Sequence, residues 1–117
     1  MIPDSQTNFL YLSDKLEGRF PSFYRRLTKI LNVLQIPYAI LPGTKDIWCR
    51  DYMPVQVTQR KFVQFRFDPG YLKKQYQHLK TNTETVCNSI ELKTVLSEII
   101  LDGGNVVKSE NKVILTD

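Results

Sequence analysis

Apolar and polar positions alternate most regularly in residues 22–35. Apolar side chains recur there at spacings of three and four, and the polar ones fall on the opposite side; the apolar set is Phe23, Leu27, Ile30, Leu31 and Leu34. Ser22 is a candidate N-cap, and Pro37 disfavours a helical backbone at the residue before it. The pattern therefore predicts an amphipathic helix that ends near Gln35.

The pattern changes to that of strands after this helix. Residues 38–41 are a short apolar run closed by Pro42 and Gly43, which indicates a buried strand. In residues 55–57 and 63–67 every second side chain is apolar, and a polar stretch separates the two runs. We expect these two strands to form a hairpin, ended by the turn residues 68–70.

The last third of the chain is less regular. Residues 71–93 suggest a loop and then one helix, and residues 95–101 suggest a strand. Residues 102–105 interrupt the pattern, and short strands are expected at 106–107 and 113–115, with a turn at 108–111. The resulting order α, β, β, β, α, β, β predicts an α/β or α+β fold in which helices cover a mixed sheet. The sequence stops in or just after a strand, so we expect residues 1–117 to be part of a larger domain.

Composition narrows the class of protein. The 117 residues suffice for one domain, and 42% hydrophobic with 24% charged residues is typical of a folded chain. No apolar run is long enough to cross a membrane and no leader is recognisable, so a cytoplasmic protein without a membrane partner is expected. Two cysteines, Cys49 and Cys87, are more often free thiols than a disulfide in such a chain.

A net charge of +4 permits a polyanionic partner. Basic residues on the predicted helix and a stretch that interleaves charge with aromatic rings resemble a single-stranded nucleic-acid surface; these residues are Arg25, Arg26, Lys29, Tyr71, Lys73, Lys74, Tyr76 and Lys80. A solvated basic face explains the helix equally well, and no nucleic-acid motif accompanies it. We therefore regard nucleic acid as an unlikely partner.

Two short motifs could carry chemistry. The stretch from Asp46 to Asp51 contains the only tryptophan, Trp48, and an arginine, Arg50. If the segment is extended, Asp46, Trp48 and Arg50 share one face. The simpler interpretation is that Arg50 pairs with a carboxylate and Trp48 fills the core. The second motif is Asp102-Gly103-Gly104-Asn105, where the glycines indicate either a bend with φ above zero or a close approach, as in a hairpin or a binding loop.

Together and in this order, the motifs resemble a known family. Residues 46–54, DIWCRDYMP, are similar to the D-x-W-x-R-D-x-G-P signature of the agmatine deiminase and bacterial peptidylarginine deiminase family, and residues 102–105 are similar to its E/D-G-G-N element. The resemblance implies the pentein fold, a five-fold pseudo-symmetric α/β propeller. Residues 1–117 would supply the first unit and the start of the second, hence an incomplete ring and the N-terminal portion of the catalytic domain.

The resemblance also implies a function and a site. The family hydrolyses guanidino groups through a cysteine nucleophile, converting agmatine to N-carbamoylputrescine and ammonia, with no metal or organic cofactor. By matched position, Asp51 would bind the substrate guanidinium and Trp48 would pack on its alkyl tail, as a carboxylate and an aromatic ring suit a planar cation. Asp102 would line the site or organise its loop. Asp46, Arg50, Gly103, Gly104 and Asn105 would be structural, with Arg50 pairing with Asp46 or Asp102.

Departures from the family pattern keep other interpretations open. Met53 stands where the signature has glycine, which could alter how Asp51 is presented. Cys49, Cys87 and His78 do not match the family's nucleophile or its histidine, so no catalytic residue is expected in this chain and alone it should be inactive. The alternatives are a non-catalytic degenerate homologue and a nucleic-acid-binding or interaction module. An incomplete ring would expose apolar edges, which leaves a homo-oligomer open.

Overall fold

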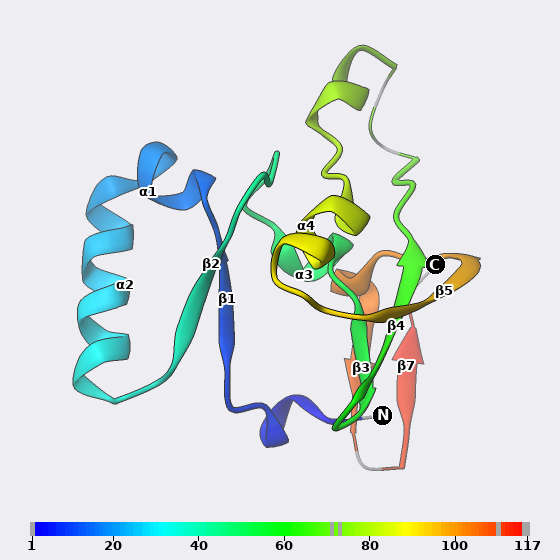
Figure 1. The fold of residues 1–117 in the computed structure, drawn as a ribbon, viewed down its shortest axis with the longest axis horizontal. Coiled ribbons are helices and arrows are strands. Elements are labelled where there is room, and N and C mark those ends of the chain that lie inside the picture. Colours follow the sequence, from blue (N-terminus) through cyan, green and yellow to red (C-terminus); the bar gives the residue numbers. More distant parts are fainter. Residues whose placement is uncertain (1, 71, 73, 110, 116–117) are drawn as a thin grey trace.

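The computed structural model describes residues 2–70, 72, 74–109 and 111–115. Its strands form three small sheets with the orders β1-β2, β3-β4-β5 and β6-β7, and helices lie beside the first two (Figure 1). The predicted mixture of helices and strands is confirmed, but the strands are divided among three sheets, of which β3-β4-β5 is the mixed one. The ring of five units stays a prediction.

A parallel strand pair opens the fold. Strand β1 (Leu10–Ser13) runs parallel to β2 (Tyr38–Leu41), and the connection between them contains α1 (Lys15–Arg19) and α2 (Pro21–Val33). We call this unit, residues 10–41, the first crossover. Its core comprises Leu12, Leu16 and Leu31, against which Leu27 of the amphipathic face packs. The predicted apolar face is covered only in part: Leu31 is buried and Leu27 packs beside it, whereas Phe23, Ile30 and Leu34 are 48%, 55% and 62% exposed.

The start of α2 corrects one prediction. Pro21 is the first helical residue and Phe20 is the N-cap, so Ser22 lies inside the helix. Proline suits that position because its missing N–H would have no helical partner and its φ is already helical. The helix ends at Val33, and Gln35 has a positive φ of 54°, close to the predicted end.

A second unit follows, residues 55–100, which we call the second crossover. Strands β3 (Val55–Thr58) and β4 (Lys61–Arg66) form the predicted antiparallel hairpin, and β5 (Thr94–Ile100) runs parallel to β4. The connection from β4 to β5 contains a 3-10 helix, Lys74–Leu79, and α4 (Thr83–Ser89), which confirms a loop followed by one helix. Val86 and Cys87 of α4 are buried. Tyr71 and Lys73, named above as nucleic-acid candidates, lie outside the described residues.

The chain then turns through a 3-10 helix, Gly103–Asn105, into the antiparallel pair β6 (Val106–Lys108) and β7 (Val113–Leu115). These two strands match the predicted ones; the turn between them includes residue 110, and the end of the chain includes residues 116–117, all outside the described residues. Both cysteines are free thiols. Within the described ranges, no helix has the length and apolarity needed to cross a bilayer.

Candidate functional site

The segment between the two crossovers, residues 42–54, carries the first motif, and we call it the linker. It is not extended, as the sequence interpretation assumed: Cys49–Tyr52 form the short helix α3, with Trp48 as N-cap. Asp46, Trp48 and Arg50 therefore do not alternate along a strand. Met53 has φ −78° and ψ 154°, a backbone that any residue adopts, so glycine is not needed there for conformational freedom.

A small cavity of about 30 Å³ lies beside α3, close to the volume of one water molecule. Its lining residues come from the linker and from the second crossover: Asp46, Trp48, Asp51, Tyr52, Phe67, Leu72, Leu79 and Thr81. Trp48 is 64% exposed, so it does not fill the core. The cavity thus places an accessible indole next to two carboxylates.

Sequence reasoning missed five of these lining residues, which are Tyr52, Phe67, Leu72, Leu79 and Thr81. Tyr52 is buried and its ring meets that of Phe67 edge to face, with centroids 6.0 Å apart. Thr81 is also buried and lies just before α4. The position of Tyr52 directly after Asp51 was a usable signal, whereas nothing in the local sequence marks Phe67 or Thr81 as neighbours of the linker.

The glycine pair lets the second motif approach α3 closely. A Cβ at Gly104 would overlap the Asp51 carboxylate and lie 3.1 Å from Oδ1 of Asp102, and one at Gly103 would overlap the carbonyl oxygen of Arg50. Neither glycine has a positive φ. Of the two reasons considered for this pair, close approach is therefore the one the structure supports. Asp102 organises the turn, since its Oδ1 accepts a hydrogen bond of 2.9 Å from the Gly104 N–H.

This approach brings Asp51 and Asp102 together. Burial raises the pKa of Asp51, and the Asp102 charge, a hydrogen bond between the two carboxyl groups and the Asp46 charge raise it further, to about 6, against a smaller opposing effect of Arg50. The two motifs, about fifty residues apart in sequence, therefore form one cluster. A pair of carboxyl groups that repel each other is a favourable place for a cation.

Arg50 is held away from this cluster. Its Nη2 donates to Oδ2 of Asp4 and to the carbonyl oxygen of Val106, each at 2.9 Å. Both partners predicted for it, Asp46 and Asp102, were therefore wrong: Asp46 pairs with Arg19 at 3.3 Å instead. The prediction failed because Asp4 is 46 residues away and no local spacing indicates the contact.

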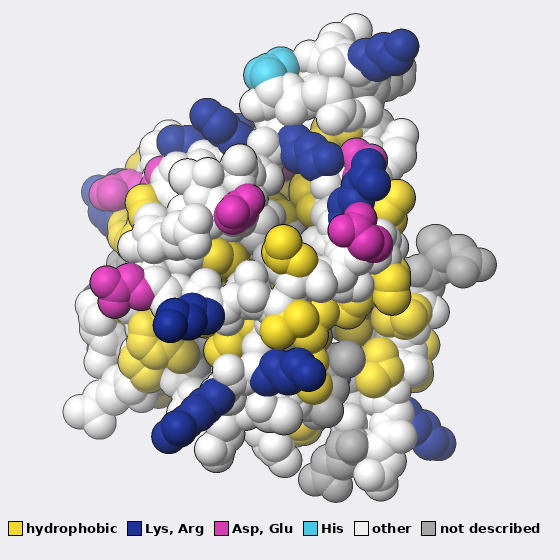
Figure 2. Space-filling view, turned by 45° about the vertical axis from the view of Figure 1, so that its right-hand side comes forward, with side chains coloured by type: hydrophobic (Ala, Val, Ile, Leu, Met, Phe, Trp, Pro, Cys, Tyr) yellow, Lys and Arg dark blue, Asp and Glu magenta, His cyan; other side chains and the backbone are white. Residues whose placement is uncertain are grey.

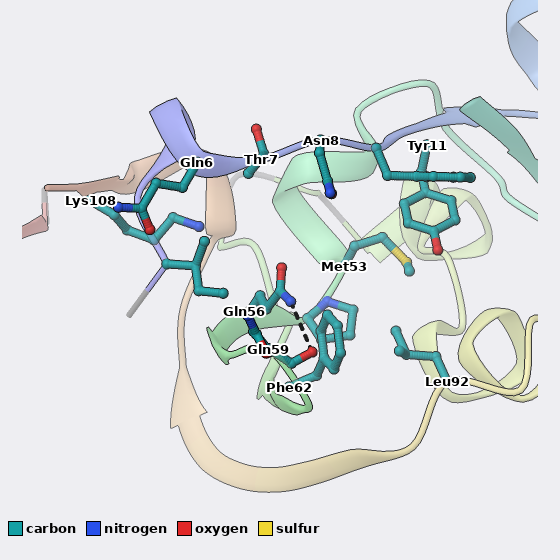
Figure 3. A pocket seen from close by; sticks show the side chains of 13 residues that line it. Gln6, Thr7, Asn8, Tyr11, Met53, Gln56, Gln59, Phe62, Leu92 and Lys108 are labelled. Carbon is teal, nitrogen blue, oxygen red and sulfur yellow. Dashed lines mark hydrogen bonds between the residues drawn. The ribbon is translucent and has the colours of Figure 1, made fainter. Parts of the chain in front are cut away.

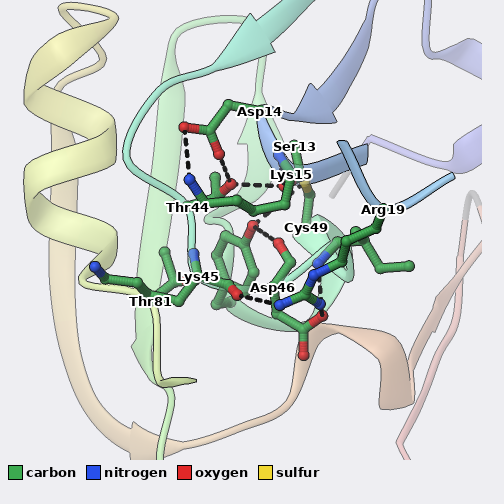
Figure 4. A network of polar contacts seen from close by, with 11 residues as sticks. Ser13, Asp14, Lys15, Arg19, Thr44, Lys45, Asp46, Cys49 and Thr81 are labelled. Carbon is green, nitrogen blue, oxygen red and sulfur yellow. Dashed lines mark hydrogen bonds and ion pairs between the residues drawn. The ribbon is translucent and has the colours of Figure 1, made fainter. Parts of the chain in front are cut away.

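A buried polar network fixes the linker to the first crossover (Figure 4). Thr44, which is fully buried, donates to Oδ1 of Asp14 and is 2.6 Å from the hydroxyl of Ser13. The Gly43 N–H donates to Oδ2 of Asp14 at 2.9 Å. Burial alone would raise the pKa of Asp14, but the hydrogen bonds from Thr44 and Gly43 outweigh it and lower that pKa below its usual range.

Further bonds hold the linker from the second crossover, from within the linker and from α1. The Lys45 N–H donates to the hydroxyl of Thr81 at 3.0 Å, and the Tyr52 hydroxyl donates to the carbonyl oxygen of Asp46 at 3.1 Å. Arg19 adds a bond of 3.1 Å to the carbonyl oxygen of Lys45. The segment that carries Asp46 and Trp48 is thus held by groups from both crossovers, which is the kind of support a pre-organised site needs.

Neither cysteine has the environment of a nucleophile. Burial raises the pKa of both Cys49 and Cys87, which disfavours the reactive thiolate. His78 lies on the exposed 3-10 helix with its Nδ1 2.9 Å from a backbone oxygen. Among the described residues, no group of three or more potential ligands is arranged to hold a metal ion.

Comparison with known families identifies the family of this chain. A family model described as Porphyromonas-type peptidyl-arginine deiminase matches residues 11–117. The chain belongs to this deiminase family. The match includes both motifs, so the resemblance inferred from residues 46–54 and 102–105 is confirmed. Searches of curated proteins and of solved structures gave no significant match.

Proposed function

We propose that this deiminase-family chain forms the guanidinium-binding wall of a hydrolase that acts on agmatine or on an arginine-like side chain. The observation that carries the proposal is the Asp51 carboxylate, which lines a small cavity beside the exposed ring of Trp48. Asp102 is not among the lining residues, but its charge acts on Asp51 from behind the cavity wall. Residues 1–117 would be the N-terminal portion of the catalytic domain.

The chemistry of a guanidinium fits each of these groups. The ion is planar and offers several N–H donors, so the Asp51 carboxylate can accept charge-assisted hydrogen bonds from it. Its positive charge relieves the repulsion between Asp51 and Asp102, and its alkyl tail can pack on Trp48. A neutral amide at Asp51 would keep the shape but lose the charge that selects a cation.

The proposed reaction needs a thiolate that attacks the guanidinium carbon. Ammonia then leaves with a transferred proton, and water cleaves the amidino-thioether to give the urea product and the free thiol. In agmatine this yields N-carbamoylputrescine. Neither cysteine of this chain suits the step, so we assign it binding and orientation: Asp51 fixes the guanidinium plane, and Trp48 fixes its tail.

The only tryptophan of the chain provides a direct assay. Agmatine titration should change the Trp48 emission, whereas 1,4-diaminobutane, which lacks the guanidine, should change it far less. Asp51→Asn should weaken agmatine binding about tenfold to a hundredfold, the range for a lost charge-assisted hydrogen bond. Asp68→Asn, an exposed carboxylate outside the cavity, is the matched control.

Activity is the second measurement, made in a protein that carries this domain together with the family's cysteine. Ammonia release from agmatine should fall to a small fraction in Asp51→Asn and stay unchanged in Asp68→Asn. Equal agmatine affinity in wild type and Asp51→Asn would refute the proposal. Activity on a peptidyl-arginine substrate but not on agmatine would keep the guanidinium site and exclude agmatine as its substrate.

A further inference from the structure

An arginine of the chain lies close to the carboxyl groups of the proposed substrate site. Arg50 directly precedes Asp51 in α3, and its carbonyl oxygen leaves no room for a Cβ at Gly103, the residue after Asp102. Burial and the neighbouring carboxyl groups raise the pKa of Asp51, and the charge of Arg50 acts in the opposite direction, so the two charges interact. The chain thus carries a guanidinium of its own beside Asp51 and Asp102, which we call the carboxylate pair.

Two acceptors from distant parts of the chain hold this guanidinium away from the carboxylate pair. Nη2 of Arg50 donates to Oδ2 of Asp4 and to the carbonyl oxygen of Val106, each at 2.9 Å. Asp4 is the first residue of the 3-10 helix Asp4–Gln6, and Val106 is the first residue of β6. Both acceptors therefore compete with the carboxylate pair for the same cation.

A second cation holds Asp4 in this position. Its Oδ1 lies 3.5 Å from Nζ of Lys108, whose side chain is only 12% exposed. Burial alone would raise the pKa of Asp4, but hydrogen bonds from Arg50 and Lys108 and their charges outweigh it and lower that pKa below its usual range. Asp4 is therefore ionised at neutral pH. Figure 3 shows Lys108 beside Gln6, and both line a pocket of about 600 Å³, so the N-terminal 3-10 helix and β6 meet here.

The two acceptors offer Arg50 different charges. A carbonyl oxygen carries only a partial charge, whereas Asp4 supplies a full negative charge, which makes its hydrogen bond the stronger one. The Arg50 side chain is about half exposed, so a change in its conformation would disturb little packing. A guanidinium released from Asp4 has the same chemistry as the proposed substrate group, and the carboxylate pair would accept it in the same way.

We propose that Asp4 is a positioning residue that withholds Arg50 from Asp51 and Asp102 and so keeps these carboxylates open to a cationic substrate. The inference rests on the proposed function, because it concerns access to that site. Asp4 touches no substrate and acts through Arg50, 46 residues away in sequence. The N-terminal 3-10 helix thereby becomes part of the support of the site.

Asp4→Asn tests this role, because it keeps the shape of the side chain and removes its charge. Carboxyl NMR titration without ligand should show the pKa of Asp51 falling from about 6 to about 5 or below, as an approaching opposite charge dictates. Agmatine affinity, followed by Trp48 emission, should fall about fivefold, because only molecules with Arg50 held elsewhere can bind substrate. Asp68→Asn, which removes an exposed carboxylate from another ion pair, should change neither quantity.

A double variant with Asp4→Asn and Arg50→Gln separates this role from a structural one. With no guanidinium left to compete, agmatine affinity should return to within about twofold of wild type, and the pKa of Asp51 should return to about 6 or above. If Asp4 only stabilised the fold, loss of a second side chain would add to the damage and restore nothing. Urea denaturation of the single and double variants measures that damage.

The pKa and affinity measurements fail in different ways. An unchanged pKa of Asp51 in Asp4→Asn would overturn the inference, even if the double variant does not fold. Lost agmatine affinity that Arg50→Gln does not restore would make Asp4 a structural residue only. If wild type does not respond to agmatine but Asp4→Asn still lowers the pKa of Asp51, the hold on Arg50 stands and the proposed function fails. Equal agmatine affinity of wild type and Asp4→Asn would leave the proposed function intact and exclude the role of Asp4.

Discussion

The first and second crossovers share a parallel strand pair joined through helices, yet they support the site in different ways. The first contributes polar groups at the end of β1 and in α1, Asp14 and Arg19, which bind the backbone of the linker. The second contributes walls: Phe67 and Thr81 line the cavity. The candidate site belongs to neither unit alone, so its geometry depends on how the linker is tied to each.

The largest expected effect comes from the contact between the glycine pair and α3. Gly103→Ala places a methyl group against the Arg50 carbonyl, and because a backbone atom cannot rotate away, we expect a loss of about 3 kcal/mol in the free energy of unfolding. Gly18→Ala in α1, where a Cβ has no atom within 4 Å, should instead stabilise by about 0.5–1 kcal/mol. Urea denaturation of both variants measures this. Equal stability of the two would contradict close approach as the reason for the glycine pair.

Thr44→Val removes the side-chain hydrogen bonds that hold the linker to the first crossover. The change keeps the shape but removes the bonds to Asp14 and Ser13 in a buried place, so we expect a loss of about 2 kcal/mol. Thr81→Val removes the hydrogen bond from the Lys45 N–H to the second crossover and should lower the free energy of unfolding by a similar amount. Thr28→Val on α2, whose hydroxyl bonds only its own helix, is the control and should change stability by less than about 0.5 kcal/mol.

Loss of either set of hydrogen bonds should also affect agmatine binding at the candidate site. Thr44→Val and Thr81→Val each free one side of the linker, so each should weaken the Trp48 response to agmatine, while Thr28→Val should not. If Thr81→Val alone weakens it, the second crossover would be the sole support of the site, and the comparison between the two units would need revision.

The sequence predicted elements with strong periodicity and missed contacts between distant segments. Strand 38–41, the 55–67 hairpin and helix α2 follow from local spacing. The strand was expected to be buried, but only Leu41 is, because β2 has a neighbouring strand on one edge alone among the described residues. Strand β1 was not predicted because it is four residues long with its first two residues exposed. The motif identified Trp48, Asp51 and Asp102 as a group, but the local sequence did not show that α3 is helical or that Arg50 reaches Asp4. Those depend on tertiary packing.

Figure 2 bears on two predicted partners, nucleic acid and a second copy of the chain. On the face shown, apolar side chains gather in the middle, and the Lys and Arg side chains lie around them with acidic ones interspersed. Nucleic-acid binding usually relies on a continuous basic stripe, which this face does not present. Apolar side chains on β5, including Leu96 and Ile99, are more than half exposed, so self-association stays a prediction that a concentration series of solution masses would test.

A substitution at Asp51 should raise the free energy of unfolding, by less than Gly103→Ala or Thr44→Val lowers it. Its raised pKa means that the folded state prefers the protonated form, so the associated stability is present below the unfolded pKa and is lost as pH rises through about 6. Asp51→Asn should therefore stabilise the chain at pH 7 by about 1 kcal/mol, after allowance for solvent screening, and flatten the stability between pH 4 and 7. Denaturation at several pH values measures this.

The same change separates stability from function. Asp51→Asn should gain stability while it loses agmatine affinity, and wild-type affinity should fall as pH drops below about 6, because protonation removes the charge that the guanidinium needs. Destabilisation by Asp51→Asn at pH 7 would show that the carboxylate has a structural partner that the cluster does not account for.

The smallest expected effect lies on the surface of the second crossover, where Asp68 accepts a bond of 2.9 Å from Lys80. Lys80 lowers the pKa of Asp68, so the sign is the reverse of that at Asp51: the pair stabilises above the unfolded pKa and its contribution is lost as pH falls through the folded one. Lys80→Gln should raise that pKa toward its usual range, followed by carboxyl NMR titration, without a measurable shift in the urea midpoint. A midpoint shift as large as that of Thr44→Val would mean that this exposed pair, and not the buried network alone, holds the crossover in place.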